Sequence, residues 1–335
     1  MEQKKQFLKL LKRLVLSTSP VILLALSYFV FDPFHVLKTY DAYPDNYLES
    51  YNRNRVSTQV FLNNNKKEAY RSFIFGSSKS SVFYTQDWAA YTDDYNTFHF
   101  DASNEIISGI YGKIKFIDRQ ENKIDNVLLV FDSETFHSTI DTANSIIHIQ
   151  DYKWSGQSNF LYQLTFFKAF FKDMYFIKYF DKLIFKTYRP YMYGAFENKH
   201  MLYTPIHNDF IFQGYIDQIR ADSAAYYARD LFYERSIEEQ VASETIASYQ
   251  VHYLNEIKTI FDKHKTNYKI VFGPNYDQKK VNSVDLEIVK DIFGNQNVSD
   301  FTGQNEFTNP LSNYYEIYHY KPVVAKEIMN QIYSK

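Results

Sequence analysis

The stretch that decides the fold runs from Ser72 to Ser81 and reads SFIFGSSKSS. Three apolar residues lead into Gly76, and a run rich in serine follows directly. Apolar residues of this kind are typical of a buried strand, and the glycine marks its end. A strand that ends this way has three interpretations: a loop that binds phosphate, an activated nucleophile, or a turn in which serine caps a helix.

The phosphate-loop interpretation fails at two positions. That motif, Gly-x4-Gly-Lys-Ser/Thr, uses its glycines to wrap backbone amides around the phosphates. When it is aligned on Lys79 and Ser80, Phe73 and Ser78 stand where the two glycines are required. The capping turn and the nucleophile both stay open, because serine is a preferred N-cap and glycine suits a sharp exit from a strand.

The composition narrows the class of protein. A chain of 335 residues that is 45% hydrophobic can bury a large core. Its net charge of -2 gives no basic surface for nucleic acid, and the absence of cysteine excludes disulfides, thiolate metal sites and cysteine nucleophiles. The nine histidines lack the spacing of metal ligands. We therefore expect no nucleic-acid partner, no metal and no cofactor.

The N-terminus predicts a membrane anchor. A basic tail, residues 1–13, precedes the uncharged run Leu14–Phe31, which at about 18 residues is a short membrane span. Positive charge before the run places the N-terminus in the cytoplasm and the rest of the chain outside. A signal peptide cleaved near Ala25–Ser27 is the alternative, but the apolar run continues past that site. We expect an uncleaved single-pass anchor in the inner (cytoplasmic) membrane and a periplasmic, or otherwise extracytoplasmic, domain.

The exported part reads as an α/β domain. Residues 32–67 mix proline, asparagine and charge and are interpreted as a tether, and residues 68–335 as the domain. Short apolar runs alternate there with stretches of helical period, which predicts a central, mostly parallel sheet with helices on both faces, a three-layer α/β/α arrangement. The expected strands are Ser72–Phe75, Thr97–Phe100, Asn126–Asp132 and Tyr268–Gly273, and the clearest helical patterns are Ile106–Ile114 and Ile246–Ile260.

One segment interrupts this alternation. Residues 160–196, within an expected insertion at about 155–235, are aromatic and helical but carry a lysine every few residues, so they do not form a membrane span. Two interpretations stay open. The helices pack on the core, or they form a surface that rests on the membrane or on a membrane partner, with the lysine side chains reaching toward water.

A serine nucleophile needs a base and a group that orients the base. Near the C-terminus the chain reads YEIYHYKP, in which Glu316 and His319 stand three apart, just before a helix that starts at about Pro322. At this spacing the carboxylate reaches the imidazole. The segment near the C-terminus therefore contains both partners that a serine at the end of the first strand would need.

Gly-Ser-Ser after a first strand, followed by acid-x-x-His before a C-terminal helix, resembles the SGNH (GDSL-type) esterase and acyltransferase superfamily. The resemblance implies an SGNH/flavodoxin-like fold, with Ser78 as the nucleophile, His319 as the base and Glu316 as the orienting acid. Ser77 takes a position at which the family usually has aspartate. Glu316 also departs from the family pattern, which has aspartate there.

The resemblance further implies an oxyanion hole. In the family its donors are the amide of the nucleophile, an amide after the second strand and an asparagine side chain after a later strand. The sequence YKIVFGPNYD places Asn275 just beyond a strand, and DASNEIISG places Asn104 after the second strand, where the family usually has glycine. Asn275 and Asn104 are therefore the expected donors.

The membrane-anchored relatives that this chain resembles modify cell-envelope polymers. They include the D-alanyl transfer protein of teichoic acid synthesis and the alginate acetylation proteins, which act beside a membrane-bound O-acyltransferase. The resemblance implies a Ser-dependent O-acyltransferase whose partners are that acyl supplier, a glycan acceptor and the lipid bilayer. Two alternatives stay open: an esterase that acts on a carbohydrate or a lipid, and a catalytically degenerate SGNH-like subunit of an envelope assembly.

Overall fold

The computed structural model describes residues 2–43, 51–132, 134–137, 146–196 and 200–334. It divides into two compact units. The first, here called the helical unit, comprises Met1–Tyr40 and Asn159–Ala195; the second, here called the sheet unit, comprises Asp41–Ser158 and Phe196–Lys335. Parts of the predicted tether and insertion, residues 44–50 and 197–199, lie outside the described residues.

The sheet unit is built on a five-stranded sheet in the order β2-β1-β3-β7-β9. All four pairings between neighbouring strands are parallel. The predicted α/β class with a central parallel sheet is thus confirmed. The strands are β1 (Ser72–Gly76), β2 (Thr97–His99), β3 (Asn126–Phe131), β7 (Asn267–Phe272) and β9 (Val298–Asp300).

The order of the strands reverses next to β1. Along the chain β2 is added on one side of β1, whereas β3, β7 and β9 follow on the other. In open parallel sheets the carboxyl ends of the strands at such a reversal point border the crevice where ligands bind. The end of β1, at Gly76, is therefore the expected place for a site.

One face of the sheet packs against two helices, one from the early part and one from the last part of the sheet unit's sequence. The strand residues Ile74, Leu128 and Val271 share a buried apolar cluster with Trp88 of α3 (Thr85–Thr92) and Ile328 of α12 (Pro322–Tyr333). Side chains alternate across a strand, so these positions point to one side. The C-terminal helix thereby closes the domain beside the first strand.

The residues of β1 that alternate with Ile74 point to the other face of the sheet, where aromatic side chains pack together. Phe61 of α2 (Arg53–Glu68) lies 6.3 Å from Phe73 and 5.6 Å from Phe100, measured between ring centroids. Phe116 of α4 (Ile107–Arg119) lies 5.9 Å from the same Phe61 ring. Helix α4 in turn packs against α10 (Ser248–His264). The abundant phenylalanines of the sequence thus serve largely as core.

Helix α2 occupies residues that the sequence analysis assigned to the tether. The Asn52 side chain caps it by accepting a hydrogen bond from the Arg55 amide at 2.9 Å. Arg53 and Arg55 are buried and pair with carboxylates distant in sequence, Asp101 at 2.5 Å and Asp151 at 3.3 Å. Polar residues therefore fill much of the buried face of α2, and for that reason its sequence lacks the apolar pattern of a core helix.

The remaining elements of the sheet unit are short. The helices are η1 (Ser78–Val82), η2 (Ile146–His148), α5 (Tyr152–Ser155), α8 (Gln213–Ala221), α9 (Ser223–Tyr227), α11 (Ser283–Phe293), η5 (Asn295–Asn297) and η6 (Leu311–Asn313). Two-stranded ribbons pair β4 (Leu202–Tyr203) with β5 (Phe210–Ile211), β6 (Gln240–Val241) with β8 (Lys279–Lys280), and β10 (Tyr314–Glu316) with β11 (His319–Tyr320).

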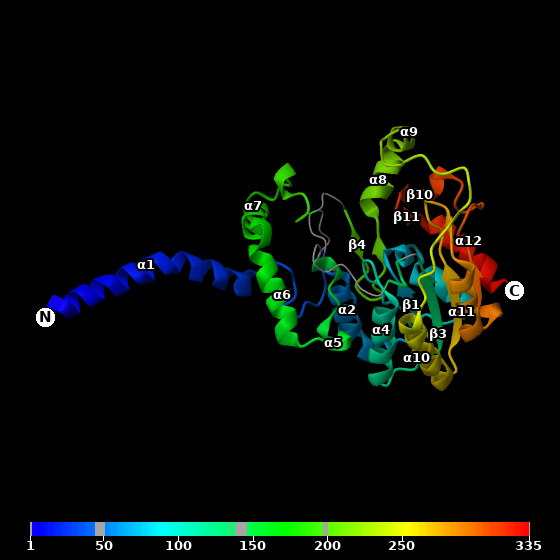
Figure 1. Ribbon diagram of the computed structural model, residues 1–335, viewed down its shortest axis with the longest axis horizontal. Coiled ribbons are helices and arrows are strands. Elements are labelled where there is room, and N and C mark those ends of the chain that lie inside the picture. The colour runs from blue at the N-terminus through cyan, green and yellow to red at the C-terminus, as the bar shows by residue number, and fades with distance from the viewer. Residues whose placement is uncertain (1, 44–50, 133, 138–145, 197–199, 335) are drawn as a thin grey trace. The chain divides into compact units, whose positions relative to one another are not determined.

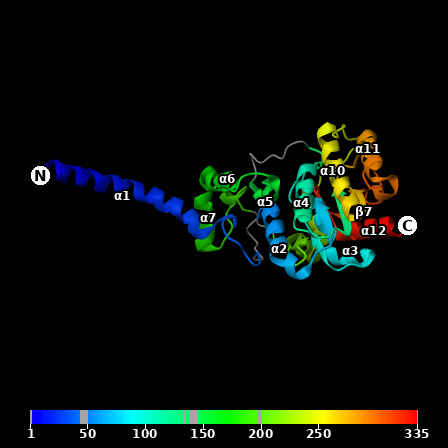
Figure 2. The same ribbon diagram turned by 90° about the horizontal axis from the view of Figure 1, so that it is seen from below.

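The helical unit contains the long N-terminal helix α1 (Glu2–Phe31), seen end to end in Figures 1 and 2. Among the described residues it is the one helix long and apolar enough to cross a membrane, with a mean hydropathy of 2.1 over its best window, a property that signal sequences share. The unit also holds α6 (Asn159–Phe171), η3 (Lys172–Met174), α7 (Tyr175–Phe185) and η4 (Pro190–Met192).

Candidate active site

The turn that follows β1 is held in a tight conformation. A Cβ on Gly76 would lie 2.6 Å from the carbonyl oxygen of Val130 and 2.8 Å from the Cβ of Ser80, so no larger residue fits at this position. The Ser77 side chain accepts a hydrogen bond from the Lys79 amide at 3.2 Å and caps η1. The capping interpretation of the serine-rich stretch therefore holds for Ser77, while Ser78 lies half-buried at the carboxyl edge of the sheet.

Ser78, His319 and Glu316 form one chain of hydrogen bonds. Ser78 Oγ lies 2.9 Å from His319 Nε2, and His319 Nδ1 is bonded to Glu316 Oε1. Glu316 and His319 face each other across the antiparallel β10–β11 ribbon. The other oxygen of Glu316 accepts a hydrogen bond from the Tyr318 amide at 2.8 Å, which fixes the carboxylate.

The contacts of His319 select one tautomer. A carboxylate accepts hydrogen bonds, so the proton of a neutral imidazole belongs on Nδ1, where it is donated to Glu316. Nε2 then carries a lone pair and accepts a hydrogen bond from the hydroxyl group of Ser78. This is the arrangement in which a histidine acts as a base toward a serine.

Aromatic residues hold the ribbon in place. The ring of Phe212 packs on the imidazole of His319, with 4.6 Å between centroids. Tyr226 donates a hydrogen bond to the carbonyl of Tyr315 at 2.6 Å, and burial raises its pKa, so it stays a neutral donor. Tyr227 donates to the carbonyl of Tyr314 at 3.0 Å. The position of His319 thus depends on packing from several short elements.

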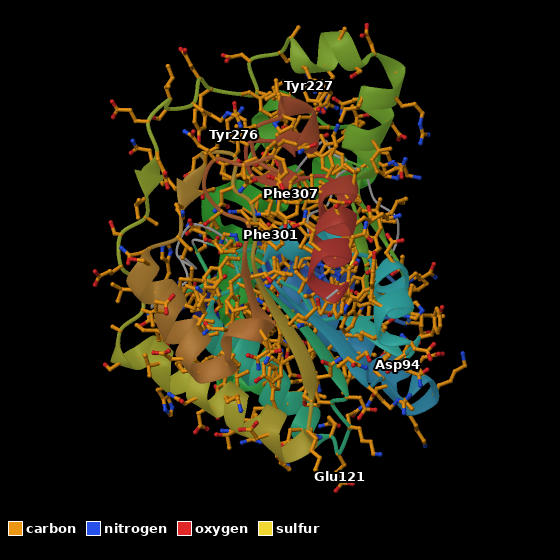
Figure 3. All side chains as sticks on the ribbon, turned by 90° about the vertical axis from the view of Figure 1, so that its right-hand side faces the viewer. Asp94, Glu121, Tyr227, Tyr276, Phe301 and Phe307 are labelled. Atoms are coloured by element: carbon orange, nitrogen blue, oxygen red, sulfur yellow. The ribbon has the colours of Figure 1, made fainter. Side chains whose placement is uncertain are left out.

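Figure 3 shows which end of the sheet unit these contacts occupy. Tyr227 and Tyr276 lie at one end, whereas Asp94 and Glu121 lie at the other. Asp94 accepts a hydrogen bond from Ser72, the first residue of β1, at 2.5 Å, so its end is the amino edge of the sheet. The tyrosine-rich end is therefore the carboxyl edge, where Ser78 follows β1.

A carboxylate on the neighbouring strand braces the turn. Ser77 Oγ donates a hydrogen bond to Asp132, which directly follows β3. The other oxygen of Asp132 accepts hydrogen bonds from the amides of Glu134 at 2.8 Å and Thr135 at 3.2 Å. This bond joins the ends of β1 and β3, the two strands that flank the reversal in strand order. The sequence analysis missed this role, because Asp132 reads as the last residue of a strand.

Asn275, one of the two expected oxyanion donors, reaches the same turn. Its side-chain oxygen accepts a hydrogen bond from Lys79 Nζ at 2.5 Å. An ammonium group only donates, so the contact fixes which atom of the amide faces Lys79 and leaves Nδ2 as the donor on the other side. The structure thus brings Asn275 to the residue next to Ser78.

Asn104, the second expected donor, lies in the loop between β2 and α4. The loop is fastened to the end of β1, because the Ala102 amide donates to the carbonyl of Gly76 at 3.3 Å. Asn104 has a left-handed backbone with φ 53, which asparagine tolerates well. Among the hydrogen bonds of the described residues, none joins Asn104 to Ser78.

Buried charges support this loop. Arg53 Nη2 pairs with the Asp101 carboxylate at 2.5 Å, and Lys113 is bonded to Glu105 and, at 3.0 Å, to the carbonyl of Asp101. Burial lowers the pKa of Lys113. Burial by itself would raise the pKa of Asp101, but Arg53, with His99 and Lys113 nearby, lowers it. Charged side chains from α2 and from α4 thus hold the loop that carries Asn104 in place.

A second serine–histidine pair lies beneath the turn. Ser80 Oγ donates to the carbonyl of Ser77 at 2.7 Å and lies 2.9 Å from His99 Nε2. His99 Nδ1 is 3.4 Å from Asp209, near enough to interact but not aligned as a hydrogen bond. Ser80 and His99 are fully buried, so the pair acts as support for the turn rather than as a site for substrate.

Comparison of the chain with protein-family models gives no match, and comparison with curated proteins gives none either. Within the described ranges, no three histidine, aspartate or glutamate side chains form a group that would hold a metal ion.

Proposed function

We propose that this chain is a membrane-anchored, extracytoplasmic, Ser-dependent O-acyltransferase that acts on a cell-envelope glycan. The observation that carries the proposal is the chain of hydrogen bonds from Ser78 through His319 to Glu316 at the carboxyl edge of a parallel sheet. A serine hydroxyl becomes a nucleophile when a base takes its proton and a carboxylate orients the base. The resemblance to SGNH proteins supports the same assignment of roles.

In the first half-reaction Ser78 Oγ attacks the carbonyl carbon of an acyl donor while His319 Nε2 takes the hydroxyl proton. The tetrahedral intermediate collapses with loss of the donor's leaving group, which receives that proton from His319. The acyl group is then held as an ester on Ser78. Glu316 accepts the hydrogen bond from Nδ1 of His319 and stabilises the imidazolium that forms in between.

The second half-reaction returns the enzyme to its starting state. A glycan hydroxyl attacks the ester carbonyl, and His319 takes its proton. The ester bond to Ser78 breaks, the proton passes to Ser78 Oγ, and the acylated glycan leaves. Water in place of the glycan gives hydrolysis by the same residues, which is the esterase alternative.

Negative charge develops on the carbonyl oxygen in both steps and needs donors aimed at it. We assign this role to the backbone amide of Ser78, to Asn275 Nδ2 and to the amide of Asn104. The contact of Lys79 with the Asn275 oxygen supports the assignment, because it orients the amide before substrate binds. Lys113 and Glu105 are positioning residues that act through the loop of Asn104.

The cellular setting of the proposal rests on α1. We infer that Leu14–Phe31 crosses the inner membrane with the N-terminus in the cytoplasm, so that the site faces the periplasm or another extracytoplasmic space. An acyl group made in the cytoplasm then needs a carrier across the bilayer. A membrane-bound O-acyltransferase is the proposed supplier. A three-layer SGNH arrangement of the sheet unit belongs to the same proposal.

Product analysis separates the proposed activity from its two alternatives. The purified full chain in detergent would receive p-nitrophenyl acetate as donor and a short oligosaccharide as acceptor, with Ser78→Ala as the control. We expect acetylated oligosaccharide from the wild type and none above background from the variant. Free acetate alone would favour the esterase. If neither product forms and Ser78 carries no acyl group by mass spectrometry, the degenerate-subunit alternative replaces the proposal.

A further inference from the structure

Helix α7 carries apolar side chains that the helical unit leaves exposed. Met174 just before it is 61% exposed, Ile177 is 46% exposed and Ile184 is 68% exposed. Ile177 and Ile184 stand seven residues apart and therefore lie on one side of the helix, where they form an apolar stripe. Met174 precedes the helix with a left-handed backbone and adds an exposed apolar side chain at its N-terminal end. Phe185 extends the same apolar surface at the end of the helix. Large apolar side chains that are exposed together on one helix are typical of a binding surface.

The segment that contains this stripe carries an excess of positive charge. Between Asn159 and Ala195 the chain holds five lysines and one arginine against two aspartates. Lysine and arginine side chains at the border of an apolar surface reach anionic headgroups while their stems cover apolar atoms. The lysines are Lys168, Lys172, Lys178, Lys182 and Lys186.

The end of α1 lies directly against α6 and α7. The ring of Tyr28 is 5.3 Å from that of Phe167 on α6, and the ring of Phe31 is 5.5 Å from that of Phe180 on α7. In Figure 1 both helices lie across the direction of α1. If α1 spans a bilayer, Tyr28 and Phe31 mark the boundary between hydrocarbon and headgroups, because the apolar run ends there. Helices α6 and α7 then lie at the depth of that boundary.

We propose that α6 and α7 are a second membrane contact of this protein, a pair of helices that lies in the headgroup region of the outer face of the bilayer. The occupant of the apolar stripe is lipid with an anionic component. Three observations agree on it: the exposed apolar stripe, the excess of positive charge, and the packing of both helices on the end of α1. The inference rests on the proposed anchor, since the anchor sets the depth of the two helices.

Single-cysteine labelling tests this contact in the full chain. The natural sequence has no cysteine, so one introduced cysteine takes an environment-sensitive NBD fluorophore at one place. The labelled variants would be Ile184→Cys and, as a second position on the stripe, Ile177→Cys. The matched control is Ile237→Cys in the sheet unit, where the natural residue is 94% exposed. Leu23→Cys, inside α1, reports on the anchor itself.

Each variant would be reconstituted alone into vesicles of phosphatidylethanolamine and phosphatidylglycerol, with and without lipids that carry a nitroxide near the headgroup or deep in the acyl chain. At Ile184 and Ile177 we expect a blue shift of the emission and a loss of intensity with the shallow nitroxide. At Ile237 neither change is expected. At Leu23 the deep nitroxide should quench more strongly than the shallow one.

The outcomes distinguish a failure of the proposed membrane contact from a failure of the proposed anchor. Quenching at Leu23 with water-like, unquenched emission at Ile184 and Ile177 would overturn the membrane contact and keep the anchor. It is also the result expected if a protein partner covers the stripe. Quenching at Ile184 and Ile177 without quenching at Leu23 would keep the contact and contradict the anchor. Water-like emission at all positions would overturn both.

Discussion

At the scale of single residues, the proposed reactivity of Ser78 depends on two partners of unequal importance. His319 contacts Ser78 Oγ directly, whereas Glu316 acts through the imidazole. In serine hydrolases, removal of the base costs about 10⁶ in turnover and removal of the orienting carboxylate about 10⁴. We expect His319→Ala and Glu316→Gln to follow this ranking, measured as single-turnover acylation with p-nitrophenyl acetate.

The conservative change Glu316→Asp provides the matched control, because it keeps a carboxylate at this position and shortens the side chain by one methylene. It should retain more activity than Glu316→Gln, since it keeps a charged acceptor for Nδ1–H of His319. Full activity in His319→Ala would show that the hydrogen-bonded chain has no role as a base.

Asn275 gives a second prediction at this scale. If its Nδ2 stabilises the oxyanion, Asn275→Ala should lower kcat by on the order of 10²–10³, the usual effect of removing one such donor. Lys79→Met is the control, because it removes the contact to the amide oxygen and leaves the amide itself. It should lower kcat less than Asn275→Ala. The reverse ranking would assign the catalytic effect to the lysine charge.

The sequence predicted the members of the site that follow a motif order, Ser78, His319, Glu316 and Asn275, and the structure brings these four together around one turn. It did not predict Asp132 or His99. Their partners, Ser77 and Ser80, lie in the turn after β1, 55 and 19 residues away along the chain, and such contacts depend on which strands become neighbours. An isolated aspartate or histidine carries no signal of that pairing.

At the scale of elements, a buried ion pair fastens the loop after β2 to α2. Arg53 and Asp101 are 5% and 3% exposed, so the loss of one partner leaves the other charge buried. We expect Arg53→Met to lower the free energy of unfolding at pH 7 by about 3–5 kcal/mol. The measurement is urea unfolding of the full chain in detergent.

The pH dependence of this effect has a definite sign. The pKa of Asp101 in the folded state is below its ordinary value of 3.8, so its contribution to stability is complete above that value and is lost as the pH falls below it. The difference in the free energy of unfolding between wild type and Arg53→Met should therefore be largest near pH 7 and shrink as the pH falls, because the variant keeps the burial of Asp101 without the arginine that lowers its pKa. A difference that grows on acidification would contradict the direction of the shift.

The elements differ in how well the sequence predicts them. The four expected strands differ from β1, β2, β3 and β7 by no more than a residue at either end, because strands that are largely buried give short apolar runs. The strand β9, Val298–Asp300, is too short to give a pattern, and two of its residues are only partly buried. The sequence of α2 shows no helical apolar pattern and resembles a tether, because ion pairs, not apolar residues, occupy much of the helix's buried side.

At the scale of the whole molecule, the proposed anchor α1 would decide on which side of the membrane the proposed site works. We expect the membrane fraction to contain the intact chain, with a mass that includes residues 1–31, because the apolar run extends past the weak cleavage site at Ala25–Ser27. In inverted vesicles of the inner membrane the sheet unit should lie in the lumen, protected from protease until detergent is added, whereas in right-side-out vesicles it should be exposed to protease. A mature protein that starts near Tyr28, or the opposite pattern of protection, would contradict the anchor.

The most direct test of the account is the reaction of Ser78 with a fluorophosphonate probe, which bonds covalently to serines that a neighbouring base has activated. The full chain would be labelled in detergent, digested and mapped by mass spectrometry, beside Ser78→Ala, His319→Ala and the buried-serine control Ser80→Ala. The account predicts one phosphonylated site, at Ser78, whose labelling is lost in the first variant and strongly slowed in the second but persists in Ser80→Ala. A folded wild-type protein that takes up no probe, or takes it up at another serine, would contradict the claim that Ser78 is the nucleophile.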